Sequence, residues 1–186
     1  ASSADGQTAL PNGQSQWITG PEARLDGHHL RAQACAVLTG LGTVQADDPQ
    51  LNVRGLDTPR QPIKVVVDSE LRISKDAQLL QTGHIILAHA NAQTPNWLSH
   101  HSNVANIQLL NVPTAEHTKT DLLALMAALA EQGINEVHAE AGYGLNGSLL
   151  QSGLVDEIVH YMAPHFLGPG LGMFRLPERN ALPQTP

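Results

Sequence analysis

The chain has 186 residues, a length typical of one domain and sufficient to bury a core without disulfides or a metal. Hydrophobic residues make up 41% of it, which excludes an intrinsically disordered chain. The formal charge of -7 disfavours a nucleic-acid or membrane-surface binder, because such polyanions repel an acidic protein. Cys35 is the single cysteine, which excludes an internal disulfide. We expect a cytoplasmic protein without a membrane span.

Strands and helices alternate along the sequence. Thr19 and Glu22 have the spacing of a capping box, which predicts a helix from Thr19 to about Gln33. Short apolar runs predict strands at 35–39, 63–67, 84–88, 107–110, 135–140 and 156–162. Helices or helical turns are predicted at 42–49, 95–99, 120–132 and 145–151. This alternation predicts one α/β domain over residues 1–186, with a largely parallel mixed sheet flanked by helices.

A candidate binding site follows the strand that ends at Glu140. Glycines at 142, 144 and 147 form a G-x-G-x-x-G pattern, in which two glycines permit a tight turn before a helix. The amide groups and the dipole at such a helix start favour an anion. We therefore predict phosphate binding there, and an ordinary strand–helix connection is the alternative.

Four further polar residues are candidates for holding a phosphate. Ser69 and Arg72 follow the strand at 63–67, where a hydroxyl and a guanidinium suit a phosphate monoester. A solvated turn is the alternative for this pair. Arg31 and Arg54 offer the forked donors that a phosphate requires, and surface ion pairs are their alternative.

Glu140 ends a strand beside the glycine pattern, where a carboxylate can accept hydrogen bonds from a ligand or handle a proton. A partly exposed strand-end acid is the alternative. His138 lies two residues earlier on the same strand face, and we interpret it as a packing residue, with a His–Glu pair as the alternative. The histidine pairs at 28–29 and 100–101 have no partners at ligand spacing, so we predict no metal site. We interpret Cys35 as a small core residue.

Several short motifs occur in one order over residues 1–172. They are SADG (3–6), SQWITG (15–20), LRAQA (30–34), TGLGTV (39–44), ADDPQL (46–51), VDS (67–69), EAG (140–142), LVDE (154–157) and AP (163–164). Together they resemble the reductase domain of bacterial bifunctional riboflavin-biosynthesis proteins. The resemblance implies a dihydrofolate-reductase-like α/β fold. It also implies NADPH-dependent reduction of the ribosyl group of 5-amino-6-(5-phosphoribosylamino)uracil, a phosphorylated pyrimidine, to a ribityl chain.

The resemblance also implies which positions form the site. It implies cofactor contacts at Ala1, Trp17, Thr43, Asp47, Ser69, Gly142, Tyr143, Gly144, Leu145, Asn146, Gly147 and Ser148. It implies substrate contacts at Ser15, Arg31, Leu51, Arg54 and Glu140. Glu140 is the predicted catalytic residue, which positions the substrate and relays a proton. We add Arg72 as a further contact near the extra phosphate of the cofactor.

The sequence departs from the family pattern at both ends. A Lys that the family usually carries two residues before Ala1 is missing, and closing strands after Gly172 are not recognisable. We interpret the chain as a reductase domain without its two ends. The resemblance further implies a homodimer and fusion to an upstream zinc deaminase domain. A related reductase of another pyrimidine or a pterin, and a nucleotide-binding module without catalysis, are the alternatives.

Overall fold

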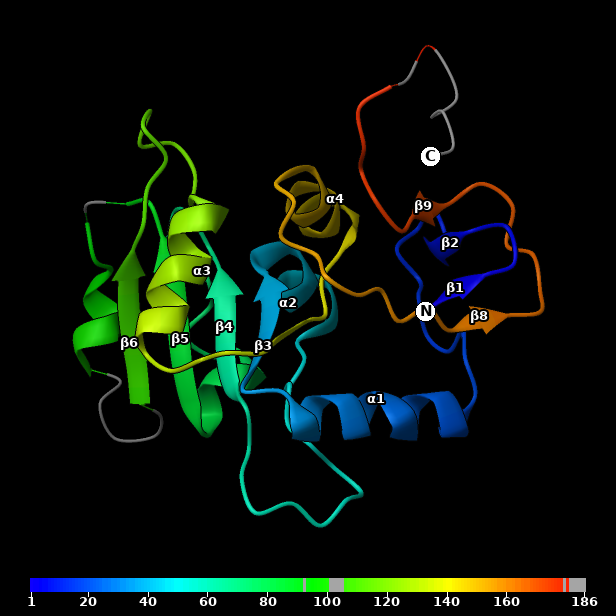
Figure 1. The fold of residues 1–186 in the computed structure, drawn as a ribbon, viewed down its shortest axis with the longest axis horizontal. Helices are drawn as coiled ribbons and strands as arrows, with labels where there is room; N and C mark the ends of the chain where they lie inside the picture. Colours follow the sequence, from blue (N-terminus) through cyan, green and yellow to red (C-terminus); the bar gives the residue numbers. More distant parts are fainter. Residues whose placement is uncertain (92, 101–105, 179, 181–186) are drawn as a thin grey trace.

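The computed structural model describes residues 1–91, 93–100, 106–178 and 180. Its centre is a parallel sheet of five strands in the order β6-β5-β4-β3-β7 (Figure 1). These strands are β3 (Ala36–Gly40), β4 (Ile63–Val67), β5 (His84–His89), β6 (Asn106–Asn111) and β7 (Val137–Ala139). The chain begins this sheet at β3, proceeds outward to β6 and returns to place β7 on the other side of β3.

Helices cover both faces of this sheet. Helices α3 (Leu122–Glu131) and α4 (Tyr143–Gln151) pack on one face, and α2 (Leu41–Asp47) and the short helix η1 (Gln78–Gln81) pack on the other. Consecutive residues of a strand point to opposite faces, so β4 contributes to two cores. The core under α3 and α4 contains Leu38, Val65, Ile86, Leu125, Leu129 and Leu149. The core under α2 and η1 contains Leu41, Val44, Val66, Leu79, Leu80, Ile85 and Leu87.

Lys64 on β4 is the largest fully buried side chain of the described residues. Its Nζ donates to the carbonyl oxygens of Leu79 and Thr82, at 3.0 and 2.8 Å, and lies 3.4 Å from the Thr82 hydroxyl. The buried amine therefore ties β4 to the end of η1. Burial lowers the pKa of Lys64 to about 8.

Helix α1 (Pro21–Gln33) leads into β3 and has no fully buried residue. Polar contacts hold it instead: Asp26 accepts a hydrogen bond of 2.6 Å from the Tyr161 hydroxyl. The predicted capping box is wrong. The helix begins at Pro21 with Gly20 as its N-cap and without a side-chain cap, because the proline ring presets the helical φ of the first turn. The carbonyl of Thr19 accepts a hydrogen bond from Arg24.

Two small sheets lie beside the α1 end of the domain (Figure 1). Strand β1 (Ser2–Ser3) pairs in parallel with β8 (Met162–Ala163), and β2 (Gln7–Ala9) pairs antiparallel with β9 (Leu171–Gly172). The strand predicted at 156–162 is therefore wrong over most of its length. Met162 is its only residue that forms part of a strand in the described chain, and Ile158 and Val159 remain exposed.

Other predicted elements are confirmed with shifted ends. The segment predicted as a turn or helix at 42–49 is α2, which begins directly after β3. The short helix predicted at 95–99 is η2 (Asn96–His100). The last helix begins at Tyr143, two residues before its predicted start. None of the helices in the described part of the chain has the length and apolarity of a membrane-spanning helix.

Candidate active site

Glu140 lies at the carboxyl edge of the central sheet, directly after β7. Its amide donates to the Leu38 carbonyl at 2.8 Å, and its carbonyl accepts from the Thr39 hydroxyl at 2.8 Å. Both partners belong to β3, so the backbone of Glu140 continues the pairing of the two strands. The chain leaves β3 toward β4 on one side and later returns to β7 on the other. Such a reversal of strand order forms the usual ligand crevice of an open parallel sheet.

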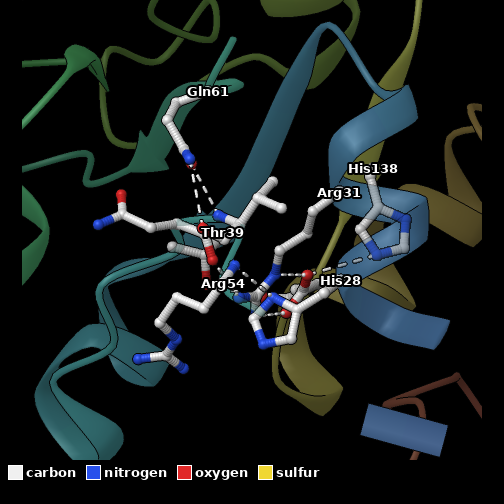
Figure 2. Close-up of polar contacts among 9 residues, drawn as sticks. His28, Arg31, Thr39, Arg54, Gln61 and His138 are labelled. Atoms are coloured by element: carbon white, nitrogen blue, oxygen red, sulfur yellow. Dashed lines mark hydrogen bonds and ion pairs between the residues drawn. The ribbon is translucent and has the colours of Figure 1, made fainter. Parts of the chain in front are cut away.

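Arg31, from the last turn of α1, donates two hydrogen bonds to the Glu140 carboxylate (Figure 2). Its Nη2 lies 2.6 Å from Oε2, and its Nε donates to Oε1. Its Nη1 donates to the Asn52 carbonyl at 3.0 Å. Arg31 thus joins α1, the loop after α2 and the end of β7. The two side chains are mostly buried, which makes this pair more strongly coupled than a surface ion pair.

His138 approaches the same carboxylate along β7. Its Nε2 lies 3.4 Å from Oε1 of Glu140. The interpretation of His138 as a packing residue is wrong, because the ring meets a charged group. Burial acts to raise the pKa of Glu140, but the hydrogen bonds and charges of Arg31 and His138 outweigh it and lower that pKa to about 2. Glu140 is therefore ionised at neutral pH.

The loop after α2 places Arg54 beside this pair (Figure 2). Leu51 has a left-handed backbone with φ +54°, and its side chain is buried. The side-chain amide of Gln61 bonds both backbone groups of Val53. The backbone amide of Arg54 donates to Nδ1 of His28 at 3.3 Å. The guanidinium of Arg54 is exposed.

The His28 ring lies within reach of both arginine charges. Burial lowers the pKa of His28, the charges of Arg31 and Arg54 lower it further, and Glu140 acts to raise it. Ala1 precedes β1 and is exposed. The structure thus brings Arg31 and Arg54 of the predicted set close to Glu140, Arg31 through its side chain and Arg54 through the loop after α2.

The glycine pattern is helical rather than a loop. Gly142 is the N-cap of α4, and its amide donates to the Thr43 hydroxyl at 3.1 Å. None of the three glycines has a positive φ. Asn146 bonds back to the Ala141 carbonyl, and its own amide is used within the helix. The free amides at the start of α4 are therefore those of Tyr143, Gly144 and Leu145.

The later residues of the pattern have a different environment. A Cβ on Gly147 would lie 2.1 Å from the Arg175 carbonyl oxygen, so this glycine permits the C-terminal segment to cross α4. The hydroxyl of Ser148 bonds the Gly144 carbonyl one turn earlier in the same helix. Leu145 packs in the core under α3 and α4. A phosphate bed that extends evenly from Gly142 to Ser148 does not fit this arrangement.

The other predicted cofactor residues lie apart from Glu140. Ser69 lies in the turn after β4. Its hydroxyl lies 3.0 Å from Oγ1 and 2.9 Å from the amide of Thr120, so its hydrogen bonds are used within the protein. Arg72 forms an exposed pair with Glu70 at 3.4 Å, which agrees with the solvated-turn alternative. Asp47 is the exposed last residue of α2.

Trp17 is 70% exposed, and the guanidinium of Arg24 lies 4.5 Å from the centre of its ring. Ser15, two positions before Trp17 in the sequence, is half-buried. A groove of about 420 Å³ lies between residues 18–23 and 160–165, and none of its lining residues is a predicted site residue. No contact of Ser15 or Trp17 with Arg31 or Glu140 is present within the described residues.

Metal-ligating side chains do not gather anywhere in the described part of the chain: no three His, Cys, Asp or Glu residues there could hold an ion together. The pair at 28–29 splits, since His28 is half-buried beside Arg54 and His29 is exposed. The second pair includes His101, which lies outside the described residues. Cys35 is partly buried against the core under α3 and α4, as predicted.

Comparisons with known proteins agree with this geometry. The family model described as RibD C-terminal domain matches residues 1–182. The chain belongs to this family. Riboflavin biosynthesis protein RibD of Escherichia coli is 39% identical over a region that spans 99% of this chain and 52% of that protein. A 5-amino-6-(5-phosphoribosylamino)uracil reductase of Buchnera aphidicola is 31% identical over 86% of this chain and 80% of that protein.

The fold is similar to that of solved members of the same family. The structure of Acinetobacter baumannii RibD, form 1, matches with a TM-score of 0.81 and 34% identity over 96% of this chain and 48% of that chain. This likeness confirms the predicted dihydrofolate-reductase-like α/β class. The chain spans about half the length of the RibD proteins that it matches.

Sequence reasoning missed three parts of the site. The carbonyl of Asn52, the ring of His28 and the amide of Gln61 all contribute to the loop that carries Arg54. Every residue has a backbone carbonyl, so the contact at Asn52 cannot be predicted from its residue type. Gln61 lies just before β4, at the far end of the loop from Asn52. His28 had a weak signal, because it lies one helical turn before Arg31 on the same face of α1.

Proposed function

We propose that this domain reduces the ribosyl group of 5-amino-6-(5-phosphoribosylamino)uracil to the ribityl product, with NADPH as the reductant. The observation that carries this proposal is the Arg31–Glu140 pair at the strand reversal between β3 and β7. The names of the relatives agree with it, since they include riboflavin-biosynthesis proteins and a reductase of this uracil derivative.

The start of α4 fits a dinucleotide phosphate. Its N-cap, Gly142, has no side-chain cap, so the first amides of the helix remain available for an anion, and the helix dipole favours negative charge there. We propose that the Thr43 hydroxyl and the backbone amides of Tyr143, Gly144 and Leu145 hold the cofactor phosphates at this point. NADPH, when bound, supplies a hydride to C1′ of the ring-opened sugar, and the imine nitrogen takes up one proton.

The residues around Glu140 hold the substrate in this proposal. Because its pKa is about 2, Glu140 acts as a charged hydrogen-bond acceptor for the substrate, and the proton of the reaction comes from another source. Arg54 has an exposed guanidinium on the loop whose Asn52 carbonyl accepts from Arg31, so it is suited to the substrate phosphate. The protein thereby orients C1′ in the crevice between β3 and β7.

A spectrophotometric assay tests the proposal directly. The purified chain is mixed with NADPH and the phosphoribosylamino-uracil, and NADPH oxidation is followed at 340 nm together with formation of the ribityl product. Oxidation with a pterin or another pyrimidine in place of this substrate would assign a different reductase activity. Binding of NADPH without any oxidation would show a binding module and overturn the proposal. The same assay with NADH measures the preference for the cofactor phosphate.

We also propose that residues 1–186 act as one domain of a longer cytoplasmic protein that carries a zinc deaminase upstream. The support is that the matched RibD proteins are about twice the length of this chain. We propose a homodimer, which sedimentation of the purified protein tests.

A further inference from the structure

His138 is a titratable group that the roles of Glu140, Arg31 and Arg54 leave unused. Because side chains alternate along a strand, His138 and Glu140 share one face of β7. The Nε2 of His138 lies 3.4 Å from Oε1 of Glu140 (Figure 2). Its Nδ1 has no hydrogen-bond partner within the described residues. The Glu140 carboxylate is therefore the one polar group that this ring meets there.

The two oxygens of Glu140 have different surroundings. Oε2 accepts from Nη2 of Arg31, whereas Oε1 faces both Nε of Arg31 and Nε2 of His138. A carboxylate oxygen can accept two hydrogen bonds, so Oε2 retains a free lone pair for a substrate donor. Contacts at Oε1 decide how the carboxylate is rotated, and therefore where the free lone pair of Oε2 is directed.

The charges around this carboxylate come from several elements. Arg31 from α1 is permanently charged. His28, also from α1, lies near the two arginines, and burial and both arginine charges lower its pKa. Tyr161 stays neutral, because desolvation and Asp26 raise its pKa to about 12. Among the side chains in direct contact with Glu140 within the described residues, Arg31 donates to both carboxylate oxygens, whereas His138 faces Oε1 alone.

We propose that His138 is a positioning residue, which fixes the Glu140 carboxylate toward the substrate through a proton on Nε2. With this proton present, the ring donates to Oε1. With Nε2 bare, two lone pairs would face each other, and the carboxylate would rotate away. This inference rests on the proposed function, because it acts through Glu140.

Kinetics of two variants and a control test the inference. His138→Leu removes the donor to Oε1, so kcat falls about 10-fold, which corresponds to about 1.4 kcal/mol. His138→Gln supplies an amide N–H in place of the ring N–H, so it recovers part of kcat. KM for NADPH stays unchanged in both variants. His29→Leu removes an exposed histidine and leaves kcat as in the wild type.

A thermal melt of each variant shows whether it is folded. A folded His138→Leu variant with the wild-type kcat would overturn the inference.

NMR spectroscopy tests the inference without requiring turnover. With ¹⁵N-labelled histidine, long-range proton–nitrogen NMR identifies which ring nitrogen of His138 carries the proton, and the His138→Gln spectrum assigns the signals. The inference requires a protonated Nε2 at pH 7, and a bare Nε2 would contradict it. Failure of the proposed function is distinct, since it appears as absence of NADPH oxidation in the wild type.

Discussion

Arg31 and Arg54 have different roles in the candidate site. Arg31 donates to both oxygens of Glu140 and to the Asn52 carbonyl, so most of its donors are engaged within the protein. The guanidinium of Arg54 is exposed, and its nearest partner within the described residues is the Gln50 amide oxygen at 3.4 Å. Arg31 therefore organises the site, and Arg54 is free to bind a ligand.

Alanine variants of the two arginines should differ in kcat and KM. Arg54→Ala removes a charged donor for the substrate phosphate, so KM for this substrate rises about 10-fold or more while kcat changes little. Arg31→Ala also releases Glu140, so kcat falls together with the rise in KM. Steady-state kinetics at fixed NADPH measures both parameters. Equal effects of the two variants on kcat would contradict this division of roles.

Glu140→Gln preserves the shape of the side chain and removes its charge. Arg31 then loses its ionic partner, and the substrate loses its charged acceptor. We expect kcat to fall about 100-fold, an effect typical of a misplaced reacting centre, with KM for NADPH unchanged. Unaltered turnover in this variant would remove Glu140 from the mechanism.

At the level of single residues, the sequence indicated which side chains matter but not which of them meet. Arg31 and Glu140 are separated by 109 positions, so no local spacing predicts their contact. His138 lies only two positions from Glu140, and strand alternation predicted the shared face correctly. Ser69 shows the opposite case: a hydroxyl that suits a phosphate is used for a hydrogen bond to Thr120.

Among the elements, α4 shows how one sequence pattern can serve two purposes. Gly142 caps the helix at the candidate site, whereas Gly147 faces the backbone of Arg175 on a different side. The G-x-G-x-x-G pattern alone does not distinguish close approach to a ligand from close approach to another segment of the same chain. The contact with Arg175 also explains how a C-terminal segment without regular structure stays on the domain.

Two glycine variants in α4 form a matched pair. Gly147→Ala places a methyl group against the Arg175 backbone, so we expect a loss of about 1–3 kcal/mol in the free energy of unfolding. A Cβ at Gly144 meets nothing within 4 Å, and alanine favours the helix, so Gly144→Ala should gain about 0.5–1 kcal/mol. Chemical denaturation measures both changes. A Gly147→Ala variant as stable as Gly144→Ala would contradict the proposed packing role.

The elements that sequence analysis placed best are those with buried neighbours on both faces. The runs at 63–67 and 84–88 form strands in the middle of the sheet. The run at 156–162 has similar residues but pairs only at its end with β1, so its composition was insufficient to predict a strand. Strand formation requires a partner, and the position of that partner is a property of the whole chain.

For the whole molecule, the strand order could not be predicted from the sequence. The alternation of elements indicated a parallel sheet, and every pairing in the central sheet is parallel. The return of the chain to place β7 beside β3 is the feature that brings Glu140 to Arg31. A different order would separate these two residues, whatever their types.

Lys64 couples the stability of the whole domain to pH. Its pKa of about 8 in the folded chain lies below the ordinary lysine value of 10.5, so unfolding takes up a proton between these values. The free energy of unfolding should therefore rise with pH from about 8 to 10.5, by on the order of 2–3 kcal/mol.

Urea unfolding at a series of pH values measures this rise. Lys64→Met removes the ionisable group and should flatten the curve in this window. Lys75→Met, at an exposed lysine, should leave the curve unchanged. A Lys64→Met curve that matches the wild type would show that Lys64 is not the group responsible.

The burial of Lys64 also divides the three lysines of the chain by reactivity. Lys75 and Lys119 are exposed, so an acylating reagent reaches their amines in the native protein, whereas the amine of Lys64 lies among carbonyl oxygens under η1. Acylation at position 64 consequently occurs only in molecules in which the core around Lys64 has locally unfolded. The fraction of acylated Lys64 peptide, measured by mass spectrometry, therefore reports how often this unfolding occurs.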